Sequence, residues 1–255
     1  CPVGAGGARR PGRHGAPTTR RVISALVTEQ PDPTAPTDPT TSQPTTSQPT
    51  TSQPARPAAD IVAELDLATK IRLLSGDGMW WVESLPDHGL DDVMVTDGPH
   101  GLRQQKSTGD HLGIAAAVES TCFPTAVTLG STWDLDLVDR VGGAIAEEAL
   151  EQGVSVVLGP GLNIKRHPAG GRSFEYFSED PLLSGRLAAA FVRGVQAHGI
   201  GTSIKHFAVN NQESYRFVVD AVVDERTLRE IYLTGFEIAL KESAPWTVMC
   251  SYNIV

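Results

Sequence analysis

The chain has 255 residues, of which 40% are hydrophobic and 20% are charged, and these values are ordinary for a folded globular protein. Its formal net charge of -9 argues against a general nucleic-acid binder, because such proteins carry a basic face. The 3 cysteines lack metal-type spacing and no apolar run reaches about 18 residues, so we expect no disulfide scaffold, zinc site or membrane span.

Residues 1–58 differ in composition from the rest of the chain. They contain three copies of the pentapeptide TTSQP at 40–54, flanked by segments rich in Pro, Thr and Arg. Such a composition buries too little apolar surface to offset the entropy of ordering the chain. We therefore expect a disordered low-complexity tail or linker, with a glycosylated stalk or a tether to another module as the alternative.

After this tail, short apolar runs alternate with segments of helical periodicity. In chain order we expect helix 61–76, strand 92–98, strand 125–131, helix 133–153, strand 154–161, helix 178–199, strand 201–210, helix 224–243 and strand 247–253. Gly76, Gly153 and Gly199 are the expected helix stops, and Asp180 and Asp224 are the expected N-terminal caps.

Strands that alternate with helices predict an α/β protein with a parallel sheet. The expected strands are apolar on both faces, which is typical of a sheet covered on both sides. This order is compatible with an open doubly wound sheet and with a (β/α)8 barrel, although a barrel needs three strands more than we find. We expect this domain to occupy residues 59–255.

Polar side chains gather just past the carboxyl ends of the expected strands, at Asp97, Asn163, Lys205, His206 and the pair 252–253. In barrels and in open parallel sheets alike, ligands bind at that edge. Plainer interpretations exist. Asp97 lies in an Asp-Gly-Pro stretch that suits an ordinary turn. The charged loop 159–181 matches no phosphate-binding motif, so a surface loop with Arg–Glu pairs competes with a functional loop.

Lys205 and His206 raise a geometric question, because neighbours on a regular strand point to opposite faces. They serve one site only if the strand ends or distorts there. The alternative is a buried His with a backbone partner and a Lys that reaches solvent. Arg216 is eleven residues further on and is able to join the same cluster. From the residues alone we expect an α/β enzyme that binds a polar, hydroxylated ligand such as a sugar.

Taken together, the segments resemble glycoside hydrolase family 3, the β-glucosidase and β-xylosidase family. The resemblance is carried in order by VTDGPHGLR, FPTAVTLGSTWD, LGPGLNIKRHPAGGRSFEYFSEDP, GIGTSIKHFAVNNQESYR and MCSYN. It implies a (β/α)8 TIM-type barrel that is incomplete at the C-terminus and is normally followed by an α/β sandwich domain. It also implies that six residues bind substrate: Asp97, Arg172, Lys205, His206, Arg216 and Tyr252.

The resemblance also implies the reaction, which is retaining, exo-acting hydrolysis of terminal β-D-glucosyl or related residues. The branch with a catalytic Pro-Gly-His-Gly loop is excluded, because residues 208–214 read AVNNQES. In the β-glucosidase branch the nucleophile Asp and the acid/base Glu both lie beyond Val255. We therefore assign no catalytic role to Asp97, Glu175 or Glu213, and we expect residues 1–255 alone to be inactive and not to fold cooperatively.

Two rival interpretations stay open. One is a non-catalytic sugar-binding protein of the same fold, and the other is an unrelated barrel oxidoreductase whose loop 159–172 holds a cofactor phosphate. The expected partner is a small β-glycoside or oligosaccharide, with no cofactor, metal, nucleic acid or membrane. No signal peptide is visible. The compartment, the oligomeric state and the preferred sugar (glucose, xylose, arabinose or galactose) are left open.

Overall fold

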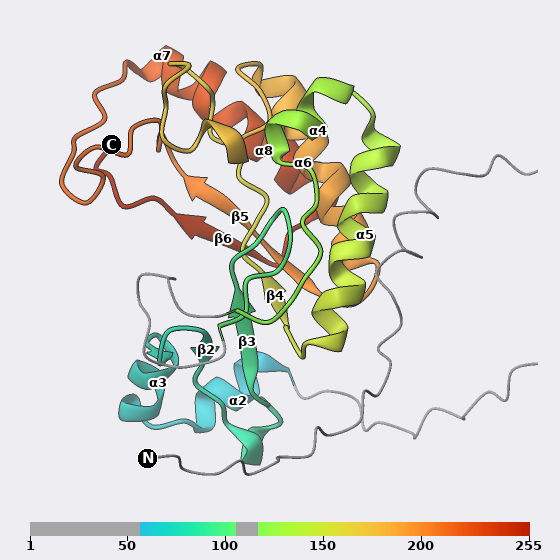
Figure 1. Ribbon diagram of the computed structural model, residues 1–255. Coiled ribbons are helices and arrows are strands. Elements are labelled where there is room, and N and C mark those ends of the chain that lie inside the picture. The colour runs from blue at the N-terminus through green and yellow to red at the C-terminus, as the bar shows by residue number, and fades with distance from the viewer. Residues whose placement is uncertain (1–56, 106–116) are drawn as a thin grey trace, which may run out of the picture. The chain divides into compact units, whose positions relative to one another are not determined.

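A computed structural model describes residues 57–105 and 117–255 (Figure 1). The predicted disordered tail therefore lies, apart from its last two residues, outside the described residues. The first element, helix α2 (Ala58–Glu64), begins one residue before the expected start of the folded domain.

The centre of the described unit is a mixed sheet with strand order β1-β2-β3-β4-β5-β6. Its four parallel strands are β3 (Val93–Thr96), β4 (Val156–Val157), β5 (Gly201–Phe207) and β6 (Thr247–Cys250). The short strands β1 (Gly76–Asp77) and β2 (Trp81–Val82) add an antiparallel edge beside β3. The predicted α/β class is confirmed. The parallel strands follow one another in chain order, with no reversal.

Three helices connect these strands and contact one another in sequence (Figure 1): α5 (Leu135–Glu151), α6 (Pro181–Gln196) and α8 (Thr234–Ser243). The expected cap at Asp180 is confirmed, because its carboxylate accepts a hydrogen bond from Leu183 N at 2.9 Å. Helices α5 and α6 approach closely at Gly194, where a Cβ would lie 2.0 Å from the Asp139 carbonyl oxygen.

The core lies between these helices and the sheet. Its largest fully buried side chains include Phe191 of α6, Phe236 of α8, Ile145 of α5 and Ile204 of β5. Burial of apolar surface at roughly 25 cal/mol per Å² is the main force that holds the helices on the strands. Within residues 57–105 and 117–255, no helix combines the length and the apolar character needed to cross a membrane.

One predicted strand is wrong. Residues 125–131 form most of helix α4 (Ala126–Thr132) rather than a strand. The Thr and Val content suggested β structure, but the buried residues Ala126, Leu129 and Gly130 fall on one helical face at spacings of three and four. The contact is tight, because a Cβ on Gly130 would lie 2.5 Å from the Phe177 carbonyl oxygen. Tertiary packing therefore overrides the local β propensity.

Two predicted helices are divided. Helix 61–76 becomes α2 and α3 (Leu67–Leu73), because Asp66 interrupts it and caps α3 by accepting from Thr69 N at 2.7 Å. Helix 224–243 begins, as expected, at a cap on Asp224 and continues as α7 (Glu225–Thr227), the π-helical turn η3 (Leu228–Leu233) and α8. The short 3₁₀ turns η1 (Pro86–His88) and η2 (Ser173–Glu175) complete the elements.

Candidate functional site

A cavity of about 440 Å³ opens at the carboxyl ends of the parallel strands. Asp97 and Leu158 directly follow β3 and β4, and Tyr252 lies two residues after β6. All six sequence-predicted ligand residues line this cavity: Asp97, Arg172, Lys205, His206, Arg216 and Tyr252. The remaining wall consists of Met79, Trp80, Arg103, Gln105, Leu158 and Met249. The six residues that the resemblance implied thus lie around one cavity, and their role in binding substrate stays a prediction.

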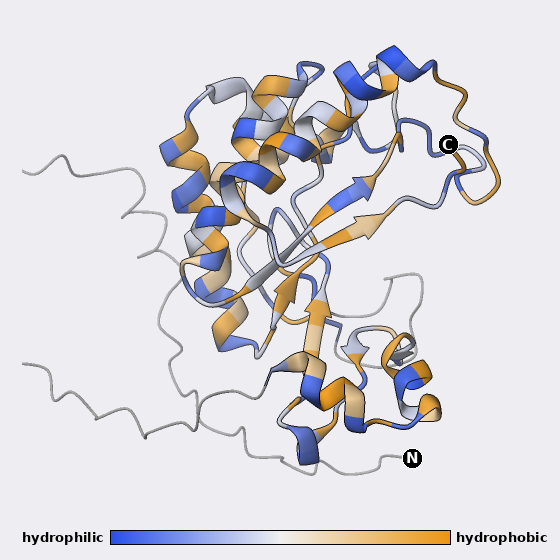
Figure 2. Ribbon diagram, turned by 180° about the vertical axis from the view of Figure 1, so that it is seen from behind, coloured by the Kyte–Doolittle hydropathy of each residue, from blue (hydrophilic) through white to orange (hydrophobic). Residues whose placement is uncertain are grey.

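Strand β5 delivers two polar side chains to the cavity because its pairing with β6 is irregular. Lys205 pairs with Met249 and Phe207 pairs with Cys250, so two steps on β5 correspond to one step on β6. His206 is the extra residue of this bulge, which breaks the alternation of a regular strand. Figure 2 shows the same stretch as the point where β5 changes from hydrophobic to hydrophilic. The distortion that the sequence required is present.

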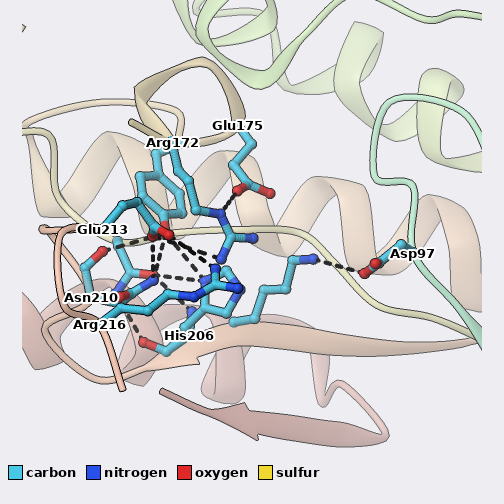
Figure 3. A network of polar contacts seen from close by, with 10 residues as sticks. Asp97, Arg172, Glu175, His206, Asn210, Glu213 and Arg216 are labelled. Carbon is cyan, nitrogen blue, oxygen red and sulfur yellow. Dashed lines mark hydrogen bonds and ion pairs between the residues drawn. The ribbon is translucent and has the colours of Figure 1, made fainter. Parts of the chain in front are cut away.

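Lys205 is almost completely buried, with 3% of its side chain exposed. Its Nζ lies 3.5 Å from Asp97 Oδ1 (Figure 3), and 47% of the Asp97 side chain is exposed. An ammonium group has three donors, and among the described residues Asp97 supplies its one carboxylate partner within 4.0 Å. The pair therefore keeps donor capacity on Lys205 and acceptor capacity on Asp97 for a ligand.

Arg172 and Arg216 both line the cavity, and both lie near the carboxylate of Glu213. Arg172 donates through Nε to Glu175 at the end of η2, and Glu175 is 5% exposed. Glu213 Oε2 accepts from Arg216 Nη1 at 2.9 Å, while Glu213 Oε1 lies 3.9 Å from Arg172 Nη1 (Figure 3). Burial opposes the charge of Arg172, but the hydrogen bond and the charge of Glu175 raise its pKa. Arg172 thus stays a cation, and Glu213 holds the Arg216 guanidinium in place.

His206 is fixed by a side chain from the preceding loop. Asn163 Oδ1 accepts from the His206 backbone N at 2.8 Å, and Asn163 Nδ2 donates to the His206 carbonyl oxygen at 2.9 Å. On the ring, Nδ1 lies 3.2 Å from the Tyr176 hydroxyl and 3.3 Å from Asn163 Oδ1. Both ring contacts thus lie at Nδ1, and His206 also lines the cavity.

The surroundings keep His206 uncharged. Burial lowers the pKa of His206 to about 2, and the nearby charges of Arg172, Lys205 and Arg216 act in the same direction. A neutral imidazole both donates and accepts one hydrogen bond, whereas the three cations only donate. His206 is therefore suited to binding a hydroxyl group rather than to carrying charge.

The sixth predicted residue, Tyr252, stands at the mouth of the cavity with 61% of its surface exposed. The Arg216 guanidinium lies 5.3 Å from the centre of the Tyr252 ring and 5.1 Å from the centre of the Phe217 ring. The two rings are 4.7 Å apart. Cation–π attraction of this kind stabilises the orientation of both Arg216 and Tyr252.

The sequence analysis missed an apolar part of the wall. Met79 and Trp80 precede β2 and line the cavity beside the charged residues. Trp80 Nε1 donates to Gln105 Oε1 at 3.2 Å, which fixes the indole ring. The signal was the aromatic pair in GMWW at 78–81, which gave no helical or strand period and therefore received no role.

The donors and acceptors of this arrangement are chemically able to bind a neutral polyhydroxylated molecule. Lys205, Arg172 and Arg216 donate hydrogen bonds, Asp97 accepts them, and Trp80 offers an apolar face. The other two carboxylates nearby, Glu175 and Glu213, are bound to arginines. In residues 57–105 and 117–255, no group of three or more His, Cys, Asp or Glu side chains is arranged to hold a metal ion.

Comparison with known proteins shows the family to which this chain belongs. The family model described as the glycosyl hydrolase family 3 N terminal domain matches residues 92–255. The chain belongs to glycoside hydrolase family 3. The matched range contains all six predicted ligand residues and every parallel strand of the sheet. The resemblance found in the sequence is therefore confirmed.

The curated family 3 relatives are much longer than this chain. Thermostable beta-glucosidase B of Acetivibrio thermocellus is 51% identical over 76% of this chain and 26% of its own length. An exo-alpha-(1->6)-L-arabinopyranosidase of Bifidobacterium breve is 50% identical over 75% of this chain and 26% of its own length. The chain thus spans about a quarter of these relatives, and they differ in the sugar that their names specify.

Solved family 3 structures share the fold. The Bifidobacterium adolescentis beta-glucosidase matches with a TM-score of 0.70 and 49% identity, over 76% of this chain and 27% of that one. Beta-glucosidase 3B of Thermotoga neapolitana, solved in complex with alpha-D-glucose, matches with a TM-score of 0.70 and 44% identity, over 77% of this chain and 29% of that one.

The lowered pKa of His206 gives this family 3 chain a distinctive acid sensitivity. The unfolded state binds a proton below pH 6.5, but folded His206 resists it down to about pH 2. Stability from this residue is therefore complete above pH 6.5 and falls as the pH decreases, by about 1.4 kcal/mol per pH unit. In the protein that contains this chain, we expect the wild type to lose about 2 kcal/mol more of its free energy of unfolding than His206→Gln between pH 7 and pH 5, measured by urea unfolding. His167 is exposed, so His167→Gln serves as the control and should lose as much stability between pH 7 and pH 5 as the wild type does. Parallel losses in the wild type and in His206→Gln would contradict the prediction.

Proposed function

We propose that this chain supplies the sugar-binding part of a retaining β-glycosidase that removes terminal β-D-glucosyl or related residues. The observation that carries the proposal is the cavity, in which donors from Lys205, Arg172 and Arg216 converge opposite an acceptor on Asp97. A sugar presents hydroxyl groups that donate and accept in every direction, and such a wall satisfies them. The beta-glucosidase names of the family 3 relatives support the same reaction.

In the proposed mechanism the chain binds and orients the sugar, while two carboxylates from other parts of the protein carry out the chemistry. Retaining hydrolysis needs a nucleophile and an acid/base about 5 Å apart. Asp97 contacts Lys205, Glu175 contacts Arg172, and Glu213 contacts Arg216, so each carboxylate at the cavity has a role in holding a cation. The family resemblance implies that the nucleophile and the acid/base lie beyond Val255, and our proposal adopts that assignment.

The test is hydrolysis by the protein that contains this chain, followed by NMR of the sugar released. We expect turnover of an aryl β-D-glucoside with the β-anomer as first product, and no turnover by residues 1–255 alone. An aryl α-L-arabinopyranoside should be assayed in parallel, because one relative is named for that sugar. An inverted product, or turnover by residues 1–255 alone, would contradict the proposed division of roles. Tight glucose binding without hydrolysis would favour the non-catalytic sugar-binding alternative.

We also propose the domain arrangement. Residues 59–255 would be the first part of a (β/α)8 barrel, and residues 1–58 a disordered tail. Support for the barrel comes from β3 to β6, which follow each other in chain order with α5, α6 and α8 in mutual contact. A doubly wound sheet reverses its strand order at a switch point, and no reversal occurs among these strands. Support for the tail comes from its composition alone.

A further inference from the structure

The ring of His206 has two possible neutral forms, with the proton on Nδ1 or on Nε2, and its neighbours distinguish them. Two groups face Nδ1, namely the Tyr176 hydroxyl at 3.2 Å and Asn163 Oδ1 at 3.3 Å. A hydroxyl accepts or donates as needed, whereas an amide oxygen only accepts. The orientation of the Asn163 amide therefore decides which form is stable.

That orientation is determined by the backbone of His206 itself. The His206 N–H requires an acceptor, which is Asn163 Oδ1 at 2.8 Å, and the His206 carbonyl requires a donor, which is Asn163 Nδ2 at 2.9 Å. If the oxygen and the nitrogen of the Asn163 amide exchanged places, Nδ2 would face the His206 N–H, which is also a donor. Oδ1 would then face the His206 carbonyl oxygen, which is also an acceptor. Because Asn163 is 2% exposed, water does not offer an alternative partner. The atom that faces Nδ1 is thus an acceptor.

Tyr176 does not need Nδ1 as an acceptor. Its hydroxyl accepts from Asn210 Nδ2 at 3.2 Å and is able to donate to the Asn210 carbonyl oxygen at 3.4 Å. Asn210 Nδ2 also donates to Glu213 Oε1 at 3.2 Å, which fixes the orientation of the Asn210 amide. Burial raises the pKa of Tyr176, so its hydroxyl keeps its proton. When Nδ1 carries a proton, Asn163 Oδ1 and the Tyr176 hydroxyl are both able to accept from it, whereas a bare Nδ1 would face the lone pairs of Asn163 Oδ1.

We propose that Asn163 is a positioning residue that fixes His206 as the Nδ1–H tautomer, so that the bare Nε2 faces the cavity as a hydrogen-bond acceptor. The hydrogen bonds of the His206 ring to described residues lie at Nδ1. The neighbouring Lys205, Arg172 and Arg216 are donors only. A ligand must therefore present a free O–H to His206. The requirement for a ligand O–H rests on the proposed function, which identifies the ligand as a sugar. The assignment of the tautomer does not depend on the proposed function.

The first test is the tautomer in the ligand-free protein that contains this chain. Nitrogen-15 NMR of the imidazole groups distinguishes a protonated from a bare ring nitrogen, and His206→Gln assigns the signal. We expect His206 to show Nδ1–H in the wild type and in Tyr176→Phe, and to shift towards Nε2–H in Asn163→Ala, where only the Tyr176 hydroxyl faces Nδ1. Observation of Nε2–H in the wild type overturns the proposal, even if Asn163→Ala fails to fold.

The second test uses the sugar. Glucose analogues in which one hydroxyl at a time is replaced by fluorine keep their shape but lose the donor at that position. We expect one analogue to bind roughly 2- to 10-fold more weakly than glucose to the wild type and to lose this difference in His206→Ala. If every analogue shows the same ratio in both proteins, Nε2 accepts no hydroxyl and the proposal is wrong. If glucose itself does not bind, the proposed function fails, and the NMR result alone decides the tautomer.

Discussion

Replacing Lys205 with methionine is expected to weaken glucose binding about 10- to 100-fold in the protein that contains this chain. Hydrogen bonds to charged groups contribute about 1.5–3 kcal/mol each, and a tenfold change in affinity corresponds to about 1.4 kcal/mol. Lys205 is 3% exposed and has Asp97 as its carboxylate partner, so its remaining donors are available only to a ligand. Isothermal titration calorimetry with glucose measures the loss.

The same substitution should leave the free energy of unfolding nearly unchanged. Methionine fills a similar volume without a buried charge, and Asp97 keeps access to solvent because 47% of its side chain is exposed. Lys165→Met is the matched control. Its ammonium donates to the Phe177 carbonyl oxygen at 3.1 Å and does not line the cavity. An affinity loss in Lys165→Met equal to that in Lys205→Met, or none in either, would show that Lys205 does not contact the sugar.

The position of the site was predictable because it depends on a rule of topology. Parallel strands place their carboxyl ends at one edge, so the polar residues that follow each strand were expected to meet there. Lys205 lies in β5, Asp97 directly follows β3 and Tyr252 follows β6, and all three line one cavity. The sequence showed only that β5 must end or distort if Lys205 and His206 are to serve one site. The bulge itself was not predictable, because the pairing of β5 with β6 joins residues more than 40 positions apart.

What sequence reasoning missed depends on contacts rather than on pattern. Helix α4 was predicted as a strand because its Thr and Val residues were judged by propensity, while the packing of Gly130 against Phe177 was invisible. The partners that hold the arginines were also missed in detail. Glu213 lies three residues from Arg216, a spacing that permits a local ion pair, but its second contact with Arg172 spans 41 residues of sequence. The role of Trp80 required the same kind of distant contact.

Replacing Glu175 with glutamine is expected to lower the free energy of unfolding by about 3 kcal/mol. Removing one partner of a buried ion pair leaves an uncompensated charge, which costs about 3–5 kcal/mol. The lower end applies here because Arg172 keeps 19% of its side chain exposed and retains Glu213 at 3.9 Å. Urea unfolding of the protein that contains this chain measures the change, and the exposed Glu179→Gln in the same loop is the control.

A double substitution separates the ion pair from the loss of the Glu175 side chain. In Arg172→Gln/Glu175→Gln no charge is left unpaired between these two positions, so the double variant should lose clearly less stability than the two single losses added together. Strict additivity would mean that the two side chains act independently. If Glu175→Gln alone stays within about 0.5 kcal/mol of the wild type, it behaves as a surface substitution. The site would then have to hold Arg172 by its contact with Glu213 instead.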